Sequence, residues 1–401
     1  HRDLHSFPTR RSSDLLAGVP LKNRVFVAAG CHGADADNIN QVAQTGVAAV
    51  VTKTITANAV EDVRPCFSMV EGGFINSVFG TTHPASQWFD VELPASKAAG
   101  IPIIASIAGL NPAEAADLAV KAVAAGADMI EMPTVCPHMG EILESMFPGL
   151  TMPPPEVHDV APYVANIKAV KAAVNVPVIA KFSMLFHANV VEWALACEQA
   201  GVDAIACADA FGPAIKIDIK TGEPTLGGPR GVGGLTGSAI KPIAVRMIME
   251  MAQHVHIPLI GVGGINRAED AIEYFMAGAS FVGVVTAGHL KGTKQFQRVV
   301  EGIDKWVEKN GYSDVSDFIG ITLKKIEARR TRGLVALTQP QPPLIDPEKC
   351  TGCNKCVISC VYDALYMGDE HKVHLVPEKC YGCGLCRDAC NFDAIRLTYF
   401  D

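Results

Sequence analysis

Several kinds of segment are missing from this sequence, and each absence excludes a class of protein. No apolar run approaches the roughly 20 residues that a membrane-spanning helix needs, so we expect no membrane association. No Lys- or Arg-rich stripe occurs, and the formal net charge of -8 argues against a nucleic-acid partner. No GxGxxG motif stands between a strand and a helix, since the Gly-rich stretch 227–237 lies in a long loop, so we expect no dinucleotide site.

The N-terminal segment also lacks something, namely the apolar stretch of a signal peptide. It is basic and rich in Ser and Arg, and its letters FPTRRSSDL resemble the translation of a common adapter oligonucleotide. We therefore predict that residues 1–14 are not native. The alternative is a mitochondrial-type presequence, which is also rich in Arg and Ser.

The 13 cysteines are not distributed like those of a secreted disulfide framework. Five are scattered through the first 207 residues, and eight lie between Cys350 and Cys390. Short, clustered spacings in a long chain indicate metal ligation in a reducing compartment. We therefore expect a cytoplasmic protein.

A regular alternation of short apolar runs and Ala-rich helical stretches fills most of the chain. Continuous apolar runs of this kind are typical of parallel strands that are covered on both faces. Eight such βα units predict an α/β fold, a (β/α)8 TIM barrel over residues 15–333 that includes C-terminal helices. The eight runs are 25–30, 48–54, 101–109, 127–134, 176–182, 202–209, 257–264 and 279–286.

Two connections in the predicted barrel are long, 55–100 after the second strand and 210–237 after the sixth. Active sites of such barrels lie at the carboxyl ends of the strands, and long loops there usually carry function. The alternative is that both are insertions without a role in the site.

A second domain follows a Pro-rich linker at 334–345. It spans residues 346–401 and contains an internal repeat, because 347–365 aligns with 377–395 at an offset of 30 positions. Two copies of a unit too small to bury a core alone predict a pseudo-symmetric pair built around cofactors.

Each copy carries four cysteines in the spacing C-x2-C-x2-C-x3-C. This spacing is typical of bacterial ferredoxins with two [4Fe–4S] clusters, in which the fourth cysteine of each run ligates the other cluster. We predict a small α+β ferredoxin domain of this kind. The usual Pro after the fourth cysteine is replaced by Val361 and Asn391, and zinc is the alternative metal. The predicted ligands are Cys350, Cys353, Cys356 and Cys390 for one cluster, and Cys380, Cys383, Cys386 and Cys360 for the other.

Glycines follow the seventh and eighth predicted strands, in GVGGI (261–265) and VVTAG (284–288). Barrels that bind phosphate commonly do so with the loops after these two strands. Glycines let backbone N–H groups close on a phosphate without a side-chain clash. The sequence therefore predicts a phosphate-bearing cofactor at this end of the barrel.

At this point the chain resembles a known family, the FMN barrels of dihydroorotate and dihydropyrimidine dehydrogenases. The resemblance runs from about Leu16 to Gly320. The CPH letters resemble the dihydropyrimidine branch more closely, and that branch also carries a C-terminal two-cluster ferredoxin domain. The segments that carry the resemblance are VTKT (51–54), FINSVFG (74–80), VCPHMGE (135–141), AKF (180–182), GGLTGSAIKPIA (233–244), GVGGI and VVT.

The resemblance implies a role for individual residues. Cys136 stands where the family has its catalytic acid/base cysteine, which exchanges a proton with the substrate while the flavin exchanges a hydride. The alternative for Cys136 is a buried, inert thiol. Lys181 and Lys53 stand at family positions that contact the flavin. The further cofactor positions are Gly234, Gly263, Gly264, Val285 and Thr286, and the substrate positions are Asn76, His138 and Asp209.

Three departures from the family pattern fall in the substrate half of the site. Pro133 replaces an Asn, Val135 replaces a polar residue, and an Asn-Thr pair becomes Asp209-Ala210. An amide both donates and accepts hydrogen bonds, whereas an ionised carboxylate only accepts them. We therefore expect an altered substrate choice.

The leading hypothesis is an FMN- and iron–sulfur-dependent oxidoreductase that acts on a CH–CH or C=C bond of a small, pyrimidine-like molecule. Electrons would pass through two [4Fe–4S] clusters to or from a separate NAD(P)H-oxidising flavoprotein subunit or a ferredoxin. The alternative is an electron-transfer subunit of a larger complex with a degenerate barrel site. The sequence leaves open whether the chain forms a homo-oligomer.

Overall fold

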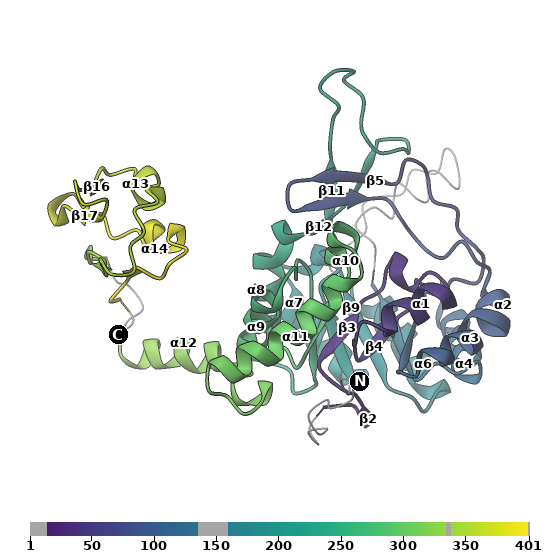
Figure 1. Cartoon of the computed structure of the whole chain (residues 1–401). Helices are drawn as coiled ribbons and strands as arrows, with labels where there is room; N and C mark the ends of the chain where they lie inside the picture. Colours follow the sequence, from purple (N-terminus) through teal and green to yellow (C-terminus); the bar gives the residue numbers. More distant parts are fainter. Residues whose placement is uncertain (1–13, 135–158, 334–337, 400–401) are drawn as a thin grey trace, which may run out of the picture. The chain divides into compact units, whose positions relative to one another are not determined.

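The computed structural model describes residues 14–134, 159–333 and 338–399. Two units can be distinguished within these residues, and the boundary between them falls between Leu323 and Lys324. The predicted domain limits at 333 and 346 stay a prediction. Each unit is described by itself, and Figure 1 shows the elements of both.

The first unit is built on a closed barrel of eight parallel strands, which confirms the predicted fold. The strands follow one another around the barrel in chain order, and the last pairs with the first. All eight coincide with the apolar runs that predicted them. They are β3 (Val25–Val27), β4 (Ala49–Val51), β7 (Ile103–Ser106), β8 (Met129–Pro133), β9 (Val178–Phe182), β10 (Ala204–Cys207), β13 (Leu259–Val262) and β14 (Phe281–Val284).

Helices surround the barrel (Figure 1) and bury its outward-facing side chains. Several end in or just before a left-handed glycine, the residue that commonly ends a helix. Gly278 ends α9 with a φ of 119°, and a Cβ on it would lie 2.5 Å from the Cβ of Ala252. This residue must be glycine for both reasons. The main helices are α1 (Ala36–Ala43), α4 (Pro112–Ala124), α6 (Ala161–Ala173), α7 (Val190–Gln199), α8 (Lys241–Met251), α9 (Ala268–Ala277) and α11 (Lys294–Lys309).

The inside of the barrel has its own apolar core, because side chains alternate along each strand. In β3, Phe26 faces inward and stacks on Phe281 of β14, at 5.4 Å between ring centroids. Leu16, from the hairpin of β1 (Leu15–Leu16) and β2 (Val19–Pro20), joins this inner cluster and is fully buried. The inner core therefore occupies the part of the barrel interior nearer the amino-terminal ends of the strands.

The two long connections are not simple loops, since their strands pair with each other. They form one antiparallel sheet in the order β11-β12-β6-β5, which Figure 1 shows at one end of the barrel. Part of the Gly-rich stretch expected as loop is thus strand. The strands are β5 (Phe67–Val70), β6 (Gly73–Asn76), β11 (Phe211–Ile215) and β12 (Val232–Gly237).

The sequence predicts two helices after the barrel, at 294–310 and 314–330. α11 matches the first, whereas the second begins only at Ile321, after the left-handed Gly320, as α12 (Ile321–Thr331). The residues before it form a short 3-10 turn, Val315–Asp317. None of the helices in the described ranges is both long and apolar enough to cross a membrane.

The second unit is small and follows the predicted repeat. The two helices α13 (Lys355–Ile358) and α14 (Leu385–Ala389) are each preceded by a left-handed residue, Asn354 and Gly384. Their positions differ by the repeat length of 30. Two short antiparallel pairs complete the unit, β15 (Leu344–Ile345) with β18 (Ile395–Arg396), and β16 (Leu365–Met367) with β17 (Val373–Leu375).

Candidate active site and cluster sites

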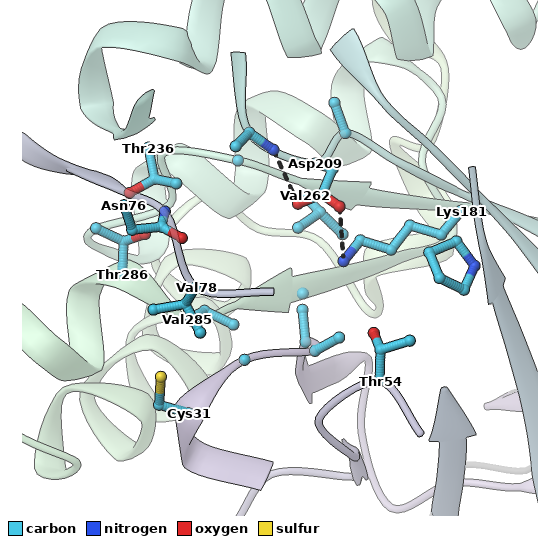
Figure 2. Close-up of a pocket in the computed structure, with 18 of the residues that line it drawn as sticks. Cys31, Thr54, Asn76, Val78, Lys181, Asp209, Thr236, Val262, Val285 and Thr286 are labelled. Atoms are coloured by element: carbon cyan, nitrogen blue, oxygen red, sulfur yellow. Dashed lines mark hydrogen bonds and ion pairs between the residues drawn. The ribbon is translucent and has the colours of Figure 1, made fainter. Parts of the chain in front are cut away.

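A cavity opens where the barrel strands end at their carboxyl termini (Figure 2). Residues in or directly after the carboxyl ends of all eight barrel strands line it, together with residues of the antiparallel sheet. Parallel strands bring their carboxyl ends to one rim, so side chains far apart in sequence meet there. This is the place where the sequence predicted the site.

Most of the predicted site residues lie in this one cavity. Gly234 does not line it, because it lies in β12 behind Asn76 and accepts a hydrogen bond from it. Cys136 and His138 lie outside the described residues. The predicted residues that line the cavity are Lys53, Asn76, Lys181, Asp209, Gly263, Gly264, Val285 and Thr286.

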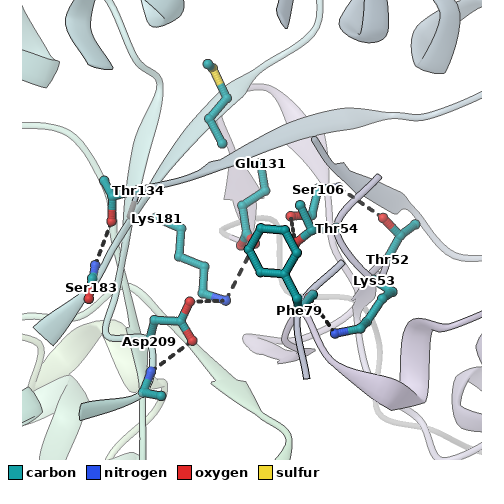
Figure 3. A network of polar contacts seen from close by, with 12 residues as sticks. Thr52, Lys53, Thr54, Phe79, Ser106, Glu131, Thr134, Lys181, Ser183 and Asp209 are labelled. Atoms are coloured by element: carbon teal, nitrogen blue, oxygen red, sulfur yellow. Dashed lines mark hydrogen bonds and ion pairs between the residues drawn. The ribbon is translucent and has the colours of Figure 1, made fainter. Parts of the chain in front are cut away.

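Lys181 reaches the cavity from inside the barrel. Alternation along β9 points Ile179 and Lys181 inward and Phe182 toward the helices. The side chain is buried, and its Nζ lies 3.5 Å from Oδ2 of Asp209 and 3.9 Å from Oε1 of Glu131 (Figure 3). A buried ammonium is costly unless carboxylates compensate it, so both acids belong to the lysine site.

Glu131 was missed by the sequence analysis. It lies in β8, is 3% exposed, and faces the barrel interior between the outward-facing Ile130 and Met132. Burial raises the pKa of this carboxyl, Lys181 lowers it, and Asp209 raises it further. The signal in the sequence was a single charged residue inside an otherwise apolar strand, which is rarely placed there without a partner.

Lys53 is held at the end of β4 by the first long connection. Its Nζ donates a hydrogen bond of 2.8 Å to the carbonyl of Phe79, and its backbone N–H donates to Gly33. The N–H of Phe79 in turn donates to the carboxylate of Asp62. The lysine is thus positioned at the cavity wall by the backbone that follows β6.

Asn76 ends β6 and contributes to the cavity wall (Figure 2). Its Nδ2 donates to the carbonyl of Gly234 at 3.2 Å, which leaves the amide oxygen to accept hydrogen bonds. Thr236 beside it donates its hydroxyl to Phe74. With the carboxylate of Asp209, this part of the wall is therefore rich in acceptors.

The glycine-rich side of the cavity fits a phosphate-bearing cofactor. Gly263 and Gly264 have φ values of 116° and 70°, which L side chains rarely adopt. A Cβ on Gly264 would lie 2.7 Å from the Cβ of Lys241 and 2.8 Å from the carbonyl oxygen of Gly237. The backbone therefore passes closely here, with N–H groups and no side chains at the cavity.

A histidine pair forms another part of the rim and was also missed by the sequence analysis. The rings of His32 and His289 are 4.3 Å apart, and His289 and the neighbouring Cys31 line the cavity. Burial and the nearby His289 lower the pKa of His32 to about 4, and burial also lowers the pKa of His289. Both imidazoles are therefore neutral at pH 7, and His289 forms an aromatic wall with Phe67 and Phe74.

The eight clustered cysteines of the second unit surround two hollows. The first is lined by Cys360 together with Cys380, Cys383 and Cys386, and the second by Cys390 together with Cys350, Cys353 and Cys356. Each hollow thus combines three thiols of one run with the fourth of the other, which is the grouping that crossed ligation requires. Within the ranges that the structure describes, no three potential ligands converge as closely as a single ion needs. The assignment of ligands stays a prediction.

Left-handed glycines shape the loops around these hollows. Gly352 and Gly382 occupy equivalent positions of the repeat, with φ values of 71° and 72°. A Cβ would lie 2.4 Å from the carbonyl oxygen of His371 at the first and 2.2 Å from the hydroxyl of Tyr399 at the second. Neither position leaves room for a side chain.

Comparison with known families assigns both units. Residues 13–307 match the family described as dihydroorotate dehydrogenase, and residues 343–397 match the 4Fe-4S dicluster domain. The first match spans well over half of the chain. The second spans both cysteine runs.

Similar proteins are known from archaea. The chain is 34% identical over 307 residues to "Dihydroorotate dehydrogenase B (NAD(+)), catalytic subunit" of Methanothermobacter thermautotrophicus, which covers 76% of this chain and 96% of that protein. The protein of the same name from Methanosarcina acetivorans is 35% identical over 310 residues, covering 77% of this chain and 94% of its own length. Both similarities leave about a quarter of this chain unmatched.

Proposed function

This chain belongs to the dihydroorotate dehydrogenase family and is an oxidoreductase with a 4Fe-4S dicluster domain, and from that premise we propose that it reduces or forms a C=C bond beside a carbonyl in a pyrimidine-like ring. The observation that carries the proposal is the convergence of Lys181, Asn76 and Asp209 with Gly263 and Gly264 on one cavity. An FMN-dependent site needs a cation beside the flavin ring, a hydrogen-bonding wall for the substrate and a glycine-rich turn for the phosphate.

The residues divide the work between cofactor and substrate. FMN, when bound, supplies hydride chemistry at its ring. The turn at Gly263 and Gly264 and the segment with Val285 and Thr286 hold the phosphate, while Lys181 holds its ammonium beside the ring. Asn76 and Asp209 orient the substrate. These assignments rest on the cavity and on the resemblance to the family.

The proton of the reaction is assigned to Cys136. In the direction of reduction, FMN would supply the hydride for one carbon of the C=C bond, and Cys136 would give a proton to the carbon next to the carbonyl. The thiolate then regains a proton from solvent, so two electrons and two protons are added in all. General acid help of this kind typically contributes 10²–10⁴-fold.

We propose that the substrate differs from that of the relatives in the hydrogen-bonding groups that it presents to the cavity wall. Pro133, Asp209 and Ala210 line the cavity where the family pattern has groups that can donate hydrogen bonds. Asp209 accepts hydrogen bonds when ionised, so it favours a ring that presents N–H groups there. The CPH letters resemble the dihydropyrimidine branch more closely than the dihydroorotate branch, which agrees with a substrate of this kind. That closer relationship stays a prediction.

Electrons enter or leave through the second unit. The eight cysteines would hold two [4Fe–4S] clusters, and these would supply single-electron transfer to or from a separate NAD(P)H-oxidising flavoprotein or a ferredoxin. The other function considered, a relay with a degenerate barrel, would not need the polar wall of Asn76 and Asp209.

A screen of substrates tests the proposal. Protein purified without oxygen is reduced, and cyclic enones and pyrimidines with and without a ring carboxylate are tested for reoxidation of the flavin absorbance. We expect an uncarboxylated pyrimidine or a related lactam to reoxidise it in repeated turnovers. Bound FMN that no member of the screen reoxidises would favour the relay, and protein without FMN would refute both.

A further inference from the structure

The carboxyl of Glu131 lies beneath the cavity and touches it only through Lys181. Glu131 does not line the cavity, whereas Lys181 does. In the pairing of β8 with β9, Lys181 stands opposite Pro133, so Glu131 is two residues nearer the bottom of the barrel. The carboxyl is therefore one layer deeper than the lysine.

Lys181 lies between this buried acid and an acid that faces the cavity. Its Nζ is 3.9 Å from Glu131 and 3.5 Å from Asp209, and both distances exceed those of a hydrogen bond. The exposed fraction of the side chain is 4% for Glu131 and 39% for Asp209. The ammonium is thus within ion-pair range of both carboxyls (Figure 3), and the carboxyl of Asp209 is the more exposed of the two.

The charge balance of this group is unusual for a barrel interior. With all three groups ionised, one cation is shared by two anions. The free-energy cost of desolvation is larger for the deeper anion, Glu131. Among the described residues, the two other polar side chains that act on Glu131 are neutral. Ser106 of β7 is neutral, and burial holds the pKa of Tyr163 of α6 well above its usual value, so the phenol stays neutral as well.

We propose that Glu131 is a positioning residue that holds the Lys181 ammonium from below and takes up one proton from solvent when negative charge accumulates on the cavity side of that lysine. This inference rests on the proposed function, because the accumulating charge is that of a reduced flavin. Lys181 is then released from the deeper acid toward the cavity. On reoxidation the carboxyl returns its proton, and the cycle balances.

Burial raises the pKa of Glu131, which supports this role because further negative charge nearby shifts that pKa in the same direction. The direction of the pH effect follows. Reduction of the flavin raises the pKa of Glu131. The carboxyl therefore takes up a proton only at pH values between its pKa in the oxidised protein and its pKa in the reduced protein. Below both values the carboxyl already holds the proton, and above both it stays ionised.

The test compares the holoprotein with Glu131→Gln, which keeps the shape of the side chain and removes its charge. The measurements are the protons taken up per two electrons at the flavin and the midpoint potential as a function of pH. We expect wild type to take up one proton more than the variant within a window of pH, and the variant to have the higher potential above that window. Glu131→Asp should restore the proton uptake.

Glu92→Gln is the matched control. Glu92 is also buried in the first unit, but it accepts hydrogen bonds from Ala36 and Gln87 and does not line the cavity. Its substitution should leave the proton count unchanged. Equal proton counts and potentials in wild type and Glu131→Gln, with FMN bound in both, would refute the role proposed for Glu131 but not the proposed function. Absence of FMN from wild type would instead refute the proposed function, and the inference with it.

Discussion

The side-chain amide of Asn76 donates a hydrogen bond to the carbonyl of Gly234, which lies 158 positions later in the chain. This bond joins β6 to β12, and so joins the two long connections of the barrel into one wall. It also orients the amide, because one N–H of Nδ2 is engaged and the Oδ1 is left to accept. The wall therefore has a defined polarity before any ligand binds.

The first prediction concerns this amide. Asn76→Ala removes an acceptor from the cavity wall, and a hydrogen bond of this kind is worth about 0.5–1.5 kcal/mol, so substrate affinity should fall about 2- to 10-fold. FMN content should not change, because the glycine-rich side is untouched. Titration of the oxidised holoprotein with ligand, followed by the flavin spectrum, measures the affinity. Thr225→Ala, outside the cavity, is the control, and equal loss in both variants would show a general effect on the sheet.

The second prediction separates an enzyme from an electron relay. Cys136→Ala should lower turnover by about 10²–10⁴-fold, which is the usual contribution of a general acid, while reduction of the flavin by an artificial donor stays unchanged. Cys136→Ser should keep part of the activity. Cys207 is buried in β10, and Cys207→Ala serves as the control that removes a thiol without touching the cavity. Unchanged turnover in Cys136→Ala would show that this thiol only packs.

The third prediction tests crossed ligation with pairs of substitutions. Wild type should hold about eight iron atoms and eight sulfides per chain if both motifs are filled. Cys360→Ser combined with Cys380→Ser removes two ligands from one hollow, so about four irons should remain. Cys360→Ser combined with Cys350→Ser damages both hollows, so little iron should remain. Clusters that close within one run would reverse the two results, and zinc without sulfide would exclude clusters altogether.

The fourth prediction concerns stability. Gly278→Ala places a Cβ 2.5 Å from Ala252 and also requires a left-handed alanine, whereas Gly201→Ala requires only the latter, since nothing lies within 4 Å of its Cβ. The left-handed conformation costs about 1–2 kcal/mol, and crowding in a packed site adds about 1–3 kcal/mol. Thermal unfolding should therefore show a larger drop in midpoint for Gly278→Ala. Equal drops would mean that α8 and α9 separate readily.

Much of this protein can be predicted from sequence because the signals are local. The eight barrel strands were predicted from apolar runs, since a strand buried on both faces needs no polar residue over its length. Gly46, Gly126, Gly201 and Gly278 all have positive φ, as expected of helix ends that precede a strand. The grouping of cysteines followed from a spacing of a few residues and a repeat of 30.

Contacts between distant segments required the tertiary structure. The sheet of β5, β6, β11 and β12 forms because two connections meet above the barrel, and neither has a strong strand pattern by itself. Glu131 lies under Lys181 only because β8 and β9 are neighbours in a particular register. His32 and His289 meet because the barrel closes its last strand on its first. The sequence by itself thus determined the eight barrel strands and the repeat of the second unit. The closure and register of the barrel decided which charges share a buried site, because burial and distance, not order along the chain, set electrostatic energies.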